Sequence, residues 1–363
     1  MKITEVRTHS LSYPLQSKFA NSHLWNTTRT AGIVEILTDA GIIGWGEGIH
    51  VPGAGICQRL IGRDPFDVEV LWEELCGQLG DVAGYSGVDI ALWDILGKAL
   101  GRPVYQLLGG ACRKAIPAYA SGLFCTDVED VTSALSDEAR GYVDAGFPAV
   151  KMKIGFGLDY DSRNTAAVRQ AIGDDVLFTV DANCAYDTAT AIEVGRRLTD
   201  QDIYWYEEPV PRDDLDGYFE IRQALGVRIA GGESLEGRRA FRDLLQRRCV
   251  DIVQPDISIA GGFSECRKIQ AMASANRIRV LPHMWGTCIR LAATIHWHAT
   301  IPDDPQPLHP EPSLFEFDMT ENSLRTELAT ERIDIVDGCV PVPEAPGLGI
   351  EIDRRVLERY RVG

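Results

Sequence analysis

Eight short apolar runs alternate with amphipathic segments between residues 115 and about 325, and this alternation constrains the fold more than any other feature. The runs begin with AIPAYASG at residue 115 and end with SLFEFD at residue 313. The segments between them carry apolar residues at helical spacing, although the last link, from about 286 to 312, is less regular. Eight alternating strands and helices in about 200 residues predict a closed parallel barrel and not an open sheet.

The segments on either side of this region have a mixed α+β pattern. AGIVEILTDAGIIGWGEG places two apolar runs around Asp39–Gly41, which predicts a β-hairpin. SGVDIALWDILGKALG, which ends at Gly101, predicts an amphipathic helix. We therefore expect a barrel over residues 115–325 and an α+β domain over residues 1–114, completed by the segment from about 326 to 363.

Charge and composition narrow the partners and the compartment. The 36 basic and 53 acidic residues give a formal charge of −17, which argues against a nucleic acid or an anionic membrane as partner. No apolar run approaches the roughly 20 residues that a membrane-spanning helix requires. The first residues lack the apolar core of a signal peptide, and the nine cysteines have no paired spacing. We therefore expect reduced thiols and a cytoplasmic protein.

Seven of the eight predicted strands carry a titratable residue near the carboxyl end. These residues are Lys151 with Lys153, Asp181, Glu207 with Glu208, Glu233, Asp256, His283 and Glu316. From Lys153 onward they follow at intervals of 28, 26, 26, 23, 27 and 33 residues, one strand–helix unit each. Because the carboxyl ends of barrel strands meet at one mouth, we expect these side chains to share one site.

Three consecutive strands of this series offer carboxylates, which predicts a metal site. Side chains alternate along a strand, so Glu207 and Glu208 point opposite ways and only one of them can join Asp181 and Glu233. Alternation alone does not decide which. An oxygen-only set suits a hard cation, above all Mg²⁺. A metal would also explain why a buried strand tolerates a carboxylate.

The residues beside the acids suggest proton transfer. Lys151 and Lys153 share a face, and the charge of one should lower the pKa of the other, so that a lysine can act as a base near neutral pH. Asp256 is placed to hydrogen-bond His283 and fix its tautomer. A lysine on one side of a metal and a His–Asp pair on the other can take a proton from carbon and deliver one elsewhere.

Over nearly its whole length the chain resembles the mandelate racemase/muconate lactonizing enzyme family of the enolase superfamily, in particular its mandelate racemase branch. The motifs that carry this likeness are GWGEG, VKMKIG, TVDAN, YEEP, GGES, QPDIS, PHMWGT and LFEFD. The resemblance implies a (β/α)7β modified TIM barrel under an α+β capping domain. It also implies Mg²⁺-dependent removal of the proton next to a carboxylate.

The resemblance assigns roles that alternation leaves open. It implies Asp181, Glu207 and Glu233 as the metal ligands. The implied catalytic residues are Lys153 as base, Lys151 beside it, the dyad of His283 and Asp256, and a protonated Glu316 that hydrogen-bonds the substrate carboxylate. The implied substrate contacts are Asn183 and, from the loops of the capping domain, His23, Trp25 and His50.

The implied substrate is a sugar acid, either an aldarate or an aldonate, or its lactone. Proton removal followed by β-elimination would give a 2-keto-3-deoxy acid, the chemistry of acid-sugar dehydratases and sugar-lactone cycloisomerases. Return of the proton to the other face would instead make a racemase or epimerase of a 2-hydroxy acid. Whether Lys153 or His283 takes the first proton stays open. The family also implies a homo-oligomer, a dimer or an octamer.

Two other interpretations are weaker. IHWHAT offers His296 and His298 as the metal pair of a hydrolase, but the surrounding segment is helical, and residues two apart on a helix point about 200° apart. A non-catalytic barrel should have lost a ligand or a base, and every predicted position is intact. Mg²⁺-dependent exchange of a substrate α-proton in D₂O would separate the enzyme from both alternatives.

Overall fold

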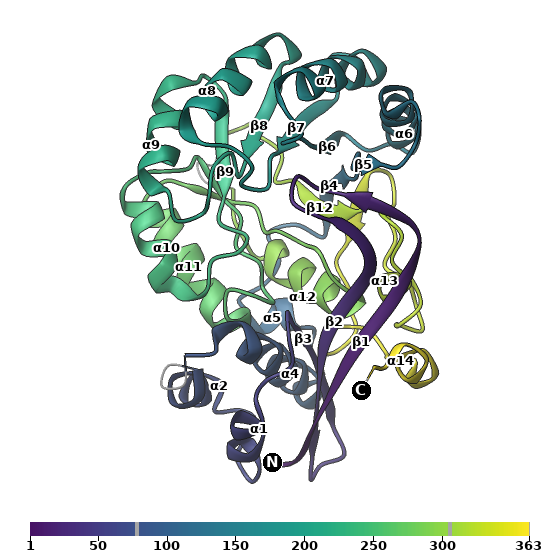
Figure 1. Cartoon of the computed structure of the whole chain (residues 1–363). Coiled ribbons are helices and arrows are strands. Elements are labelled where there is room, and N and C mark those ends of the chain that lie inside the picture. The colour runs from purple at the N-terminus through teal and green to yellow at the C-terminus, as the bar shows by residue number, and fades with distance from the viewer. Residues whose placement is uncertain (77–79, 304–306, 363) are drawn as a thin grey trace.

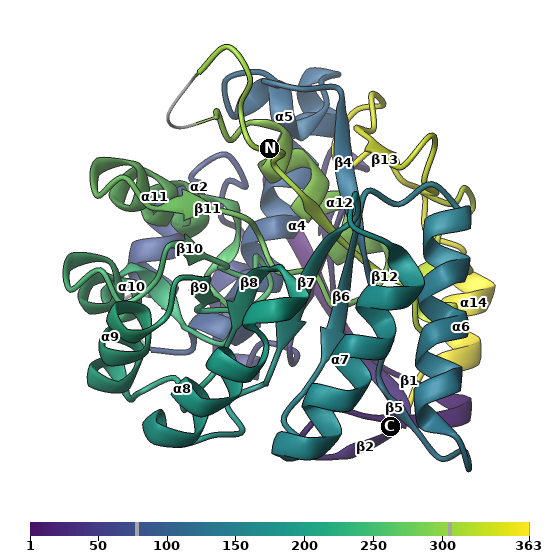
Figure 2. The same cartoon turned by 90° about the horizontal axis from the view of Figure 1, so that it is seen from above.

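The computed structural model describes residues 1–76, 80–303 and 307–362, and its centre is a curled parallel sheet (Figures 1 and 2). Seven strands pair in chain order and an eighth returns to pair with the first, which confirms the predicted parallel barrel. The strands are β4 (Ala115–Ser121), β6 (Ala149–Lys153), β7 (Leu177–Asp181), β8 (Ile203–Glu207), β9 (Arg228–Gly231), β10 (Ile252–Val253), β11 (Arg279–Val280) and β12 (Phe315–Asp318).

Helices connect these strands along the outer side of the sheet (Figure 2). They are α6 (Val131–Asp144), α7 (Leu158–Ile172), α8 (Thr188–Arg197), α9 (Leu215–Ala224), α10 (Gly237–Gln246) and α11 (Gly262–Ala275). Aspartates cap several of these helices at the N-terminus. There a side-chain carboxylate accepts a hydrogen bond from a backbone N–H group of the first turn. The Asp187 side chain accepts from Thr190 N at the start of α8, and Asp214 accepts from Gly217 N at the start of α9.

The two outermost strands of the sheet, β11 and β12, are linked by a hydrogen bond between a backbone N–H group and a side chain. Among the described residues no backbone ladder links them. Both β10 and β11 are two residues long, and each is followed after one residue by a proline, which cannot donate to a ladder. Met284 N instead donates to Glu316 Oε2 over 3.1 Å. The gap between β11 and β12 is therefore bridged by Met284 and Glu316, which lie in the region of the predicted site.

The capping domain contains an antiparallel sheet in the order β3-β2-β1-β5 (Figure 1). Its strands are β1 (Ile3–Ala20), β2 (Trp25–Thr38), β3 (Ile43–Gly48) and β5 (Cys125–Thr126). The predicted hairpin at Asp39–Gly41 joins β2 to β3. The helical segments are α1 (Ala54–Leu60), α2 (Val68–Leu71), η1 (Trp72–Cys76), α4 (Val82–Leu100) and α5 (Val104–Leu107).

Helix α4 differs from its prediction in one respect. It ends, as expected, at Gly101, which has a left-handed φ of 64°. The expected amphipathic pattern is wrong, because every residue from Ala83 to Gly97 is buried. Helix α4 packs against β3 on one side and against α11 of the barrel on another, so it has no face that is polar throughout.

The C-terminal segment contacts both parts of the molecule. It contains α13 (Ser323–Thr326), β13 (Cys339–Pro341) and α14 (Arg354–Tyr360). Strand β13 pairs antiparallel with β4 of the barrel. Helix α14 packs against β1, and Val362 N donates to Ser10 O over 2.9 Å. None of the described helices combines the length and apolar character that crossing a bilayer would require.

Candidate active site

A cavity of about 330 Å³ lies at the carboxyl ends of the barrel strands, under the capping domain. From the barrel it is lined by Lys153, Asn183, Glu233 and His283. Segments of β2 and β3 line it from the capping domain. Its volume lies at the lower end of the range for small-molecule sites.

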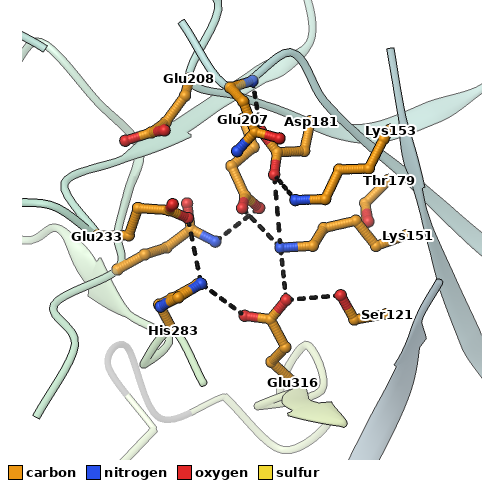
Figure 3. Close-up of polar contacts among 12 residues, drawn as sticks. Ser121, Lys151, Lys153, Thr179, Asp181, Glu207, Glu208, Glu233, His283 and Glu316 are labelled. Carbon is orange, nitrogen blue, oxygen red and sulfur yellow. Dashed lines mark hydrogen bonds and ion pairs between the residues drawn. The ribbon is translucent and has the colours of Figure 1, made fainter. Parts of the chain in front are cut away.

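Asp181, Glu207 and Glu233 converge beside this cavity (Figure 3). Each offers an oxygen, and the three oxygens lie within 4.8 Å of one another. Asp181 and Glu207 end neighbouring strands, β7 and β8, and Glu233 follows β9 by two residues. The Glu233 Oε2 atom is buried and accepts no hydrogen bond from the described residues.

Glu207 and Glu208 do point apart, and the structure distinguishes them. Glu207 Oε1 accepts from Lys151 Nζ over 2.6 Å, while its Oε2 accepts from Trp205 Nε1 and Gln254 Nε2 over 2.9 and 2.8 Å. Glu208 leaves the strand with a positive φ of 42° and approaches the Cys184 thiol instead, 3.5 Å away. In Figure 3 its carboxylate lies outside the cluster formed by Asp181, Glu207 and Glu233.

The two lysines are held by the acids. Lys151 is fully buried, with Nζ 2.6 Å from Glu207 and 2.7 Å from Glu316, and Lys153 Nζ bonds to Asp181. The expectation that their mutual repulsion lowers a lysine pKa is wrong for this state. Burial and the charge of Lys151 lower the pKa of Lys153, but Asp181, Glu233 and Glu207 outweigh them and raise it.

His283 and Asp256 form the predicted hydrogen bond. His283 Nδ1 lies 2.6 Å from Asp256 Oδ2, which leaves His283 Nε2 toward Glu233 and Glu316, at 3.4 and 3.9 Å. Asp256 also pairs with Arg290 of helix α12 (Cys288–Ala299). Burial alone would lower the pKa of His283, but Glu233, Glu316 and the bond to Asp256 raise it to about 9.

Glu316 lies beside Lys151, and its charge state differs from the expectation. Its Oε1 accepts from Ser121 Oγ and faces Lys151 Nζ, both at 2.7 Å. Burial would raise the pKa of Glu316, but the positive charges of Lys151, His283 and Lys153 hold it well below its usual range. These neighbours favour the carboxylate form of Glu316, whereas the resemblance implies a protonated acid.

The three converging carboxylates fit a hard divalent cation. Their donor set is oxygen only, as Mg²⁺ prefers. Burial raises the pKa of Glu207 to about 7, and Asp181, Glu316 and Glu233 add to the rise although Lys151 opposes it. Positive charge at this place would relieve that repulsion, and Glu233 Oε2 accepts no hydrogen bond from the described residues, although His283 Nε2 lies 3.4 Å from it.

The capping-domain residues predicted as substrate contacts behave differently from one another. His23 Nε2 hydrogen-bonds the backbone carbonyl of Asn183, which lines the cavity, so His23 touches the site wall. Trp25 is 44 % exposed and packs under Lys18. His50 is exposed and bonds to Asp81 over 3.1 Å. Neither Trp25 nor His50 lines the cavity, so the structure does not support them as contacts.

Sequence reasoning missed several cavity residues from distant segments. These are Asn26, Thr28, Arg29, Glu47, Phe124, Trp285, Arg290 and Asn322. Glu47 and Trp285 lie within motifs that carried the resemblance, yet no role followed from their spacing. Arg29 lies four residues after Trp25, which the resemblance implied as a contact, but no local pattern marks it as a buried residue.

The His296 and His298 pair forms no metal site. Both lie on α12 and are fully buried. His296 Nε2 bonds to Leu348 O over 3.1 Å, while His298 Nε2 bonds to Ser313 Oγ over 2.8 Å. Burial lowers the pKa of His296 to about 4 and that of His298 to about 3, so both are neutral structural residues.

Comparison with known families covers both parts of the chain. The mandelate racemase/muconate lactonizing enzyme N-terminal domain matches residues 3–109, and the enolase C-terminal domain-like family matches residues 134–356. The chain belongs to the mandelate racemase/muconate lactonizing enzyme family of the enolase superfamily. The resemblance read from the motifs is thereby confirmed.

Members of this family with curated activities align end to end with the chain. D-galactarolactone cycloisomerase of Agrobacterium fabrum is 40% identical over 100% of this chain and 99% of its own length. Arabinonate dehydratase of Saccharolobus solfataricus is 34% identical over 99% of each. A solved racemase of Streptomyces coelicolor with bound magnesium is 29% identical, covers 99% of this chain and 100% of its own, and has a TM-score of 0.86.

Proposed function

We propose that the protein is an Mg²⁺-dependent enzyme that removes the proton next to the carboxylate of a sugar acid or its lactone and then eliminates the β-substituent. The observation that carries the proposal is the convergence of Asp181, Glu207 and Glu233 within 4.8 Å, beside a cavity that is lined by Glu233, Lys153 and His283. The relatives named above, a sugar-lactone cycloisomerase and a sugar-acid dehydratase, support the substrate class.

In this proposal Asp181, Glu207 and Glu233 hold the cation. When bound, the ion would withdraw electron density from the substrate carboxylate and acidify the adjacent C–H bond. Lys151, buried between Glu207 and Glu316, keeps a positive charge where negative charge develops on that carboxylate. Lys153 Nζ and His283 Nε2 are the two groups that take or give a proton.

In the proposed elimination, the α C–H bond and the Cβ–O bond both break. One of the two groups takes the α-proton, and the electron pair of the C–H bond moves toward the carboxylate. That pair then forms a Cα–Cβ double bond as the Cβ–O bond breaks. A β-hydroxyl leaves as water with a proton from the other group, and the resulting enol tautomerises to a 2-keto-3-deoxy acid. In a lactone the ring oxygen leaves and the ring opens.

A racemase or epimerase is the second candidate. The two proton-transfer groups come from separate strands, β6 for Lys153 and the loop after β11 for His283, and they approach the carboxylate cluster from different sides (Figure 3). A group on each side suits return of a proton to the opposite face. The solved racemase relative supports this candidate.

A screen of sugar acids and their lactones tests the proposal. The purified protein with Mg²⁺ is incubated with each compound in D₂O, and 2-keto product and deuterium at the α-carbon are measured. Keto product supports elimination, and deuterium exchange with inversion but no keto product supports the racemase. Neither product nor exchange from any compound would contradict both candidates.

A further inference from the structure

Arg29 of strand β2 is a buried cation in the wall of the active-site cavity. Its side chain is only 5 % exposed, and it lines the same cavity as Lys153, Glu233 and His283. It comes from the capping domain, whereas those three groups come from the barrel. A buried guanidinium is costly unless every donor finds a partner.

Two neighbours hold the Arg29 guanidinium in a fixed orientation. Nη2 bonds to Asp318 Oδ2, and the guanidinium carbon lies 3.6 Å from the centroid of the Trp285 ring. Trp285 is itself packed against Phe124, with ring centroids 5.4 Å apart. These contacts leave Nη1, which is buried and has no hydrogen-bond partner among the described residues. A donor is thus available in an oriented group.

Other charged groups lie near the Arg29 guanidinium. Asp318 also faces a second arginine, Arg325, which Asp334 faces as well. The other oxygen of Asp318 is taken by Thr320, whose N and Oγ1 lie 2.9 and 2.6 Å away. Burial lowers the pKa of Arg29, and Arg325 and Arg290 add to this effect against Asp318. Arg290 is offset by Asp256 and Glu47, and Arg325 also faces Asp334, so the support for an anionic ligand is the unpartnered Nη1 of Arg29 and not an excess of charge.

The side-chain amide of Asn322 adds a hydrogen-bond acceptor to the cavity wall. Asn322 lines the cavity, and its Nδ2 donates to Gly286 O over 2.9 Å. Its Oδ1 is buried and has no partner among the described residues. An acceptor of this kind suits a substrate hydroxyl, so this end of the cavity offers sites for both an anion and a sugar hydroxyl.

We propose that Arg29 is a specificity-determining residue that binds the second carboxyl group of a sugar diacid, remote from the carboxylate beside the reacting C–H bond. The inference rests on the proposed function and narrows its substrate to an aldarate or the monolactone of one. In a monolactone this second group is an ester. When the Cβ–O bond breaks, its electron pair stays on the ring oxygen, and a carboxylate forms at which Arg29 supplies positive charge.

The test compares diacids with monoacids of the same hydroxyl configuration, such as galactarate with galactonate and glucarate with gluconate. Turnover to keto product gives kcat/KM, and calorimetry with Mg²⁺ present gives Kd without turnover. We expect the wild-type protein to favour its diacid at least about tenfold. Arg29→Met should lose at least about tenfold on the diacid and leave the monoacid nearly unchanged, and Arg29→Lys should recover part of the loss.

Two further variants separate binding from folding. Arg29→Met leaves Asp318 buried without its partner, so the double variant Arg29→Met/Asp318→Asn removes that charge and should show the same loss of selectivity. Arg325→Met is the matched control, because Arg325 faces Asp318 but does not line the cavity. It should keep the preference for the diacid.

The outcomes distinguish this inference from the proposed function. Turnover of monoacids alone, or an equal loss on both classes in Arg29→Met, would overturn the role of Arg29 and leave the proposed function intact. If no compound reacts or exchanges its α-proton, the proposed function fails. The Kd measured by calorimetry then still tests whether Arg29 binds the second carboxyl group. Diacid binding that depends on Arg29 supports the subsite, and binding unaffected by Arg29→Met overturns it.

Discussion

At the scale of single residues, the site is a buried cluster of opposite charges. Lys151, Asp181 and Glu207 have no exposed surface, and Glu316 is 1 % exposed. Groups so buried keep their charge only because each faces an opposite one. Removal of any member changes the protonation of its neighbours, so the effects of substitutions within the cluster should not add.

Lys153 and His283 should each be essential for product formation. Lys153→Ala and His283→Ala should each lower kcat for keto product by at least about a hundredfold, because each removes one proton-transfer group. Deuterium exchange at the substrate α-carbon, followed by NMR, should survive in only one of them. The variant that still exchanges retains the group that takes the first proton. Full turnover in both variants would show that neither residue has the proposed role.

At the scale of elements, strand β3 and helix α4 pack backbone to backbone. The glycines of GWGEG line one face of β3, and a Cβ at Gly46 would lie 1.8 Å from the Gly87 carbonyl oxygen of α4. The alternate residue Glu47 points the other way, where its carboxylate accepts from Thr287 N and Arg290 N at the start of α12. Strand β3 therefore joins α4 to the barrel wall of the cavity.

Gly46→Ala should destabilise the protein by about 3 kcal/mol or more, because backbone atoms of α4 cannot move away from the new methyl group. The free energy of unfolding in urea measures the effect. Gly55→Ala in α1 is the matched control, since a Cβ there meets nothing within 4 Å. It should change stability by less than about 1 kcal/mol. Equal effects of the two variants would contradict this packing.

Asp89 links α4 to α11 and should make stability depend on pH. It is fully buried, and its Oδ2 accepts from Ser264 N over 3.1 Å. Burial raises its pKa to about 7, above the value of an unfolded chain. Between about pH 4 and 7 the folded state therefore holds a proton that the unfolded state has lost, and this contribution to stability declines as pH rises.

Asp89→Asn should remove that decline while retaining an acceptor for Ser264 N. Relative to wild type, its free energy of unfolding should rise by up to about 4 kcal/mol between pH 4 and 7 and then level off. Urea unfolding at a series of pH values measures the difference between the two proteins. A difference that is constant over this range would show that Asp89 does not titrate there.

What could be predicted from the sequence depended on how far apart the cooperating residues lie. Lys153, Asp181 and His283 were found because consecutive strands repeat their positions at regular intervals. Arg29 and Asn322 were missed, because they reach the cavity only through the docking of separate segments, which no local period encodes. The ion pair between Glu316 and Lys151 was also not predicted, since it depends on the packing of β12 beside β4 and β6.

At the scale of the whole molecule, cation binding should be coupled to stability. Mg²⁺ that binds only the folded state should add about 2.7 kcal/mol to the free energy of unfolding at a concentration one hundred times Kd. Asp181→Asn should lose most of this gain, and Glu208→Gln should keep it, because Glu208 lies outside the carboxylate cluster. Thermal unfolding with and without Mg²⁺ measures the gain. Equal gains in both variants would rule out the proposed ligand set.

The homo-oligomer and the cytoplasmic location stay predictions, as do the domain limits at residues 114 and 325. All nine cysteines are free thiols, and four of them are buried. Sedimentation of the purified protein would measure the number of subunits directly.

The tip of the β1–β2 hairpin rests on the loop after β7, where Ser22 Oγ donates to Ala182 O over 2.8 Å and His23 bonds to Asn183 O. The residues proposed for proton transfer and Arg29, proposed for the far end of the substrate, come from separate stretches of the sequence. After gene duplication, substitutions in the short segment around this hairpin could change which sugar is bound and leave the reaction itself unchanged. The architecture itself offers a route by which one ancestor gives rise to many specialised descendants.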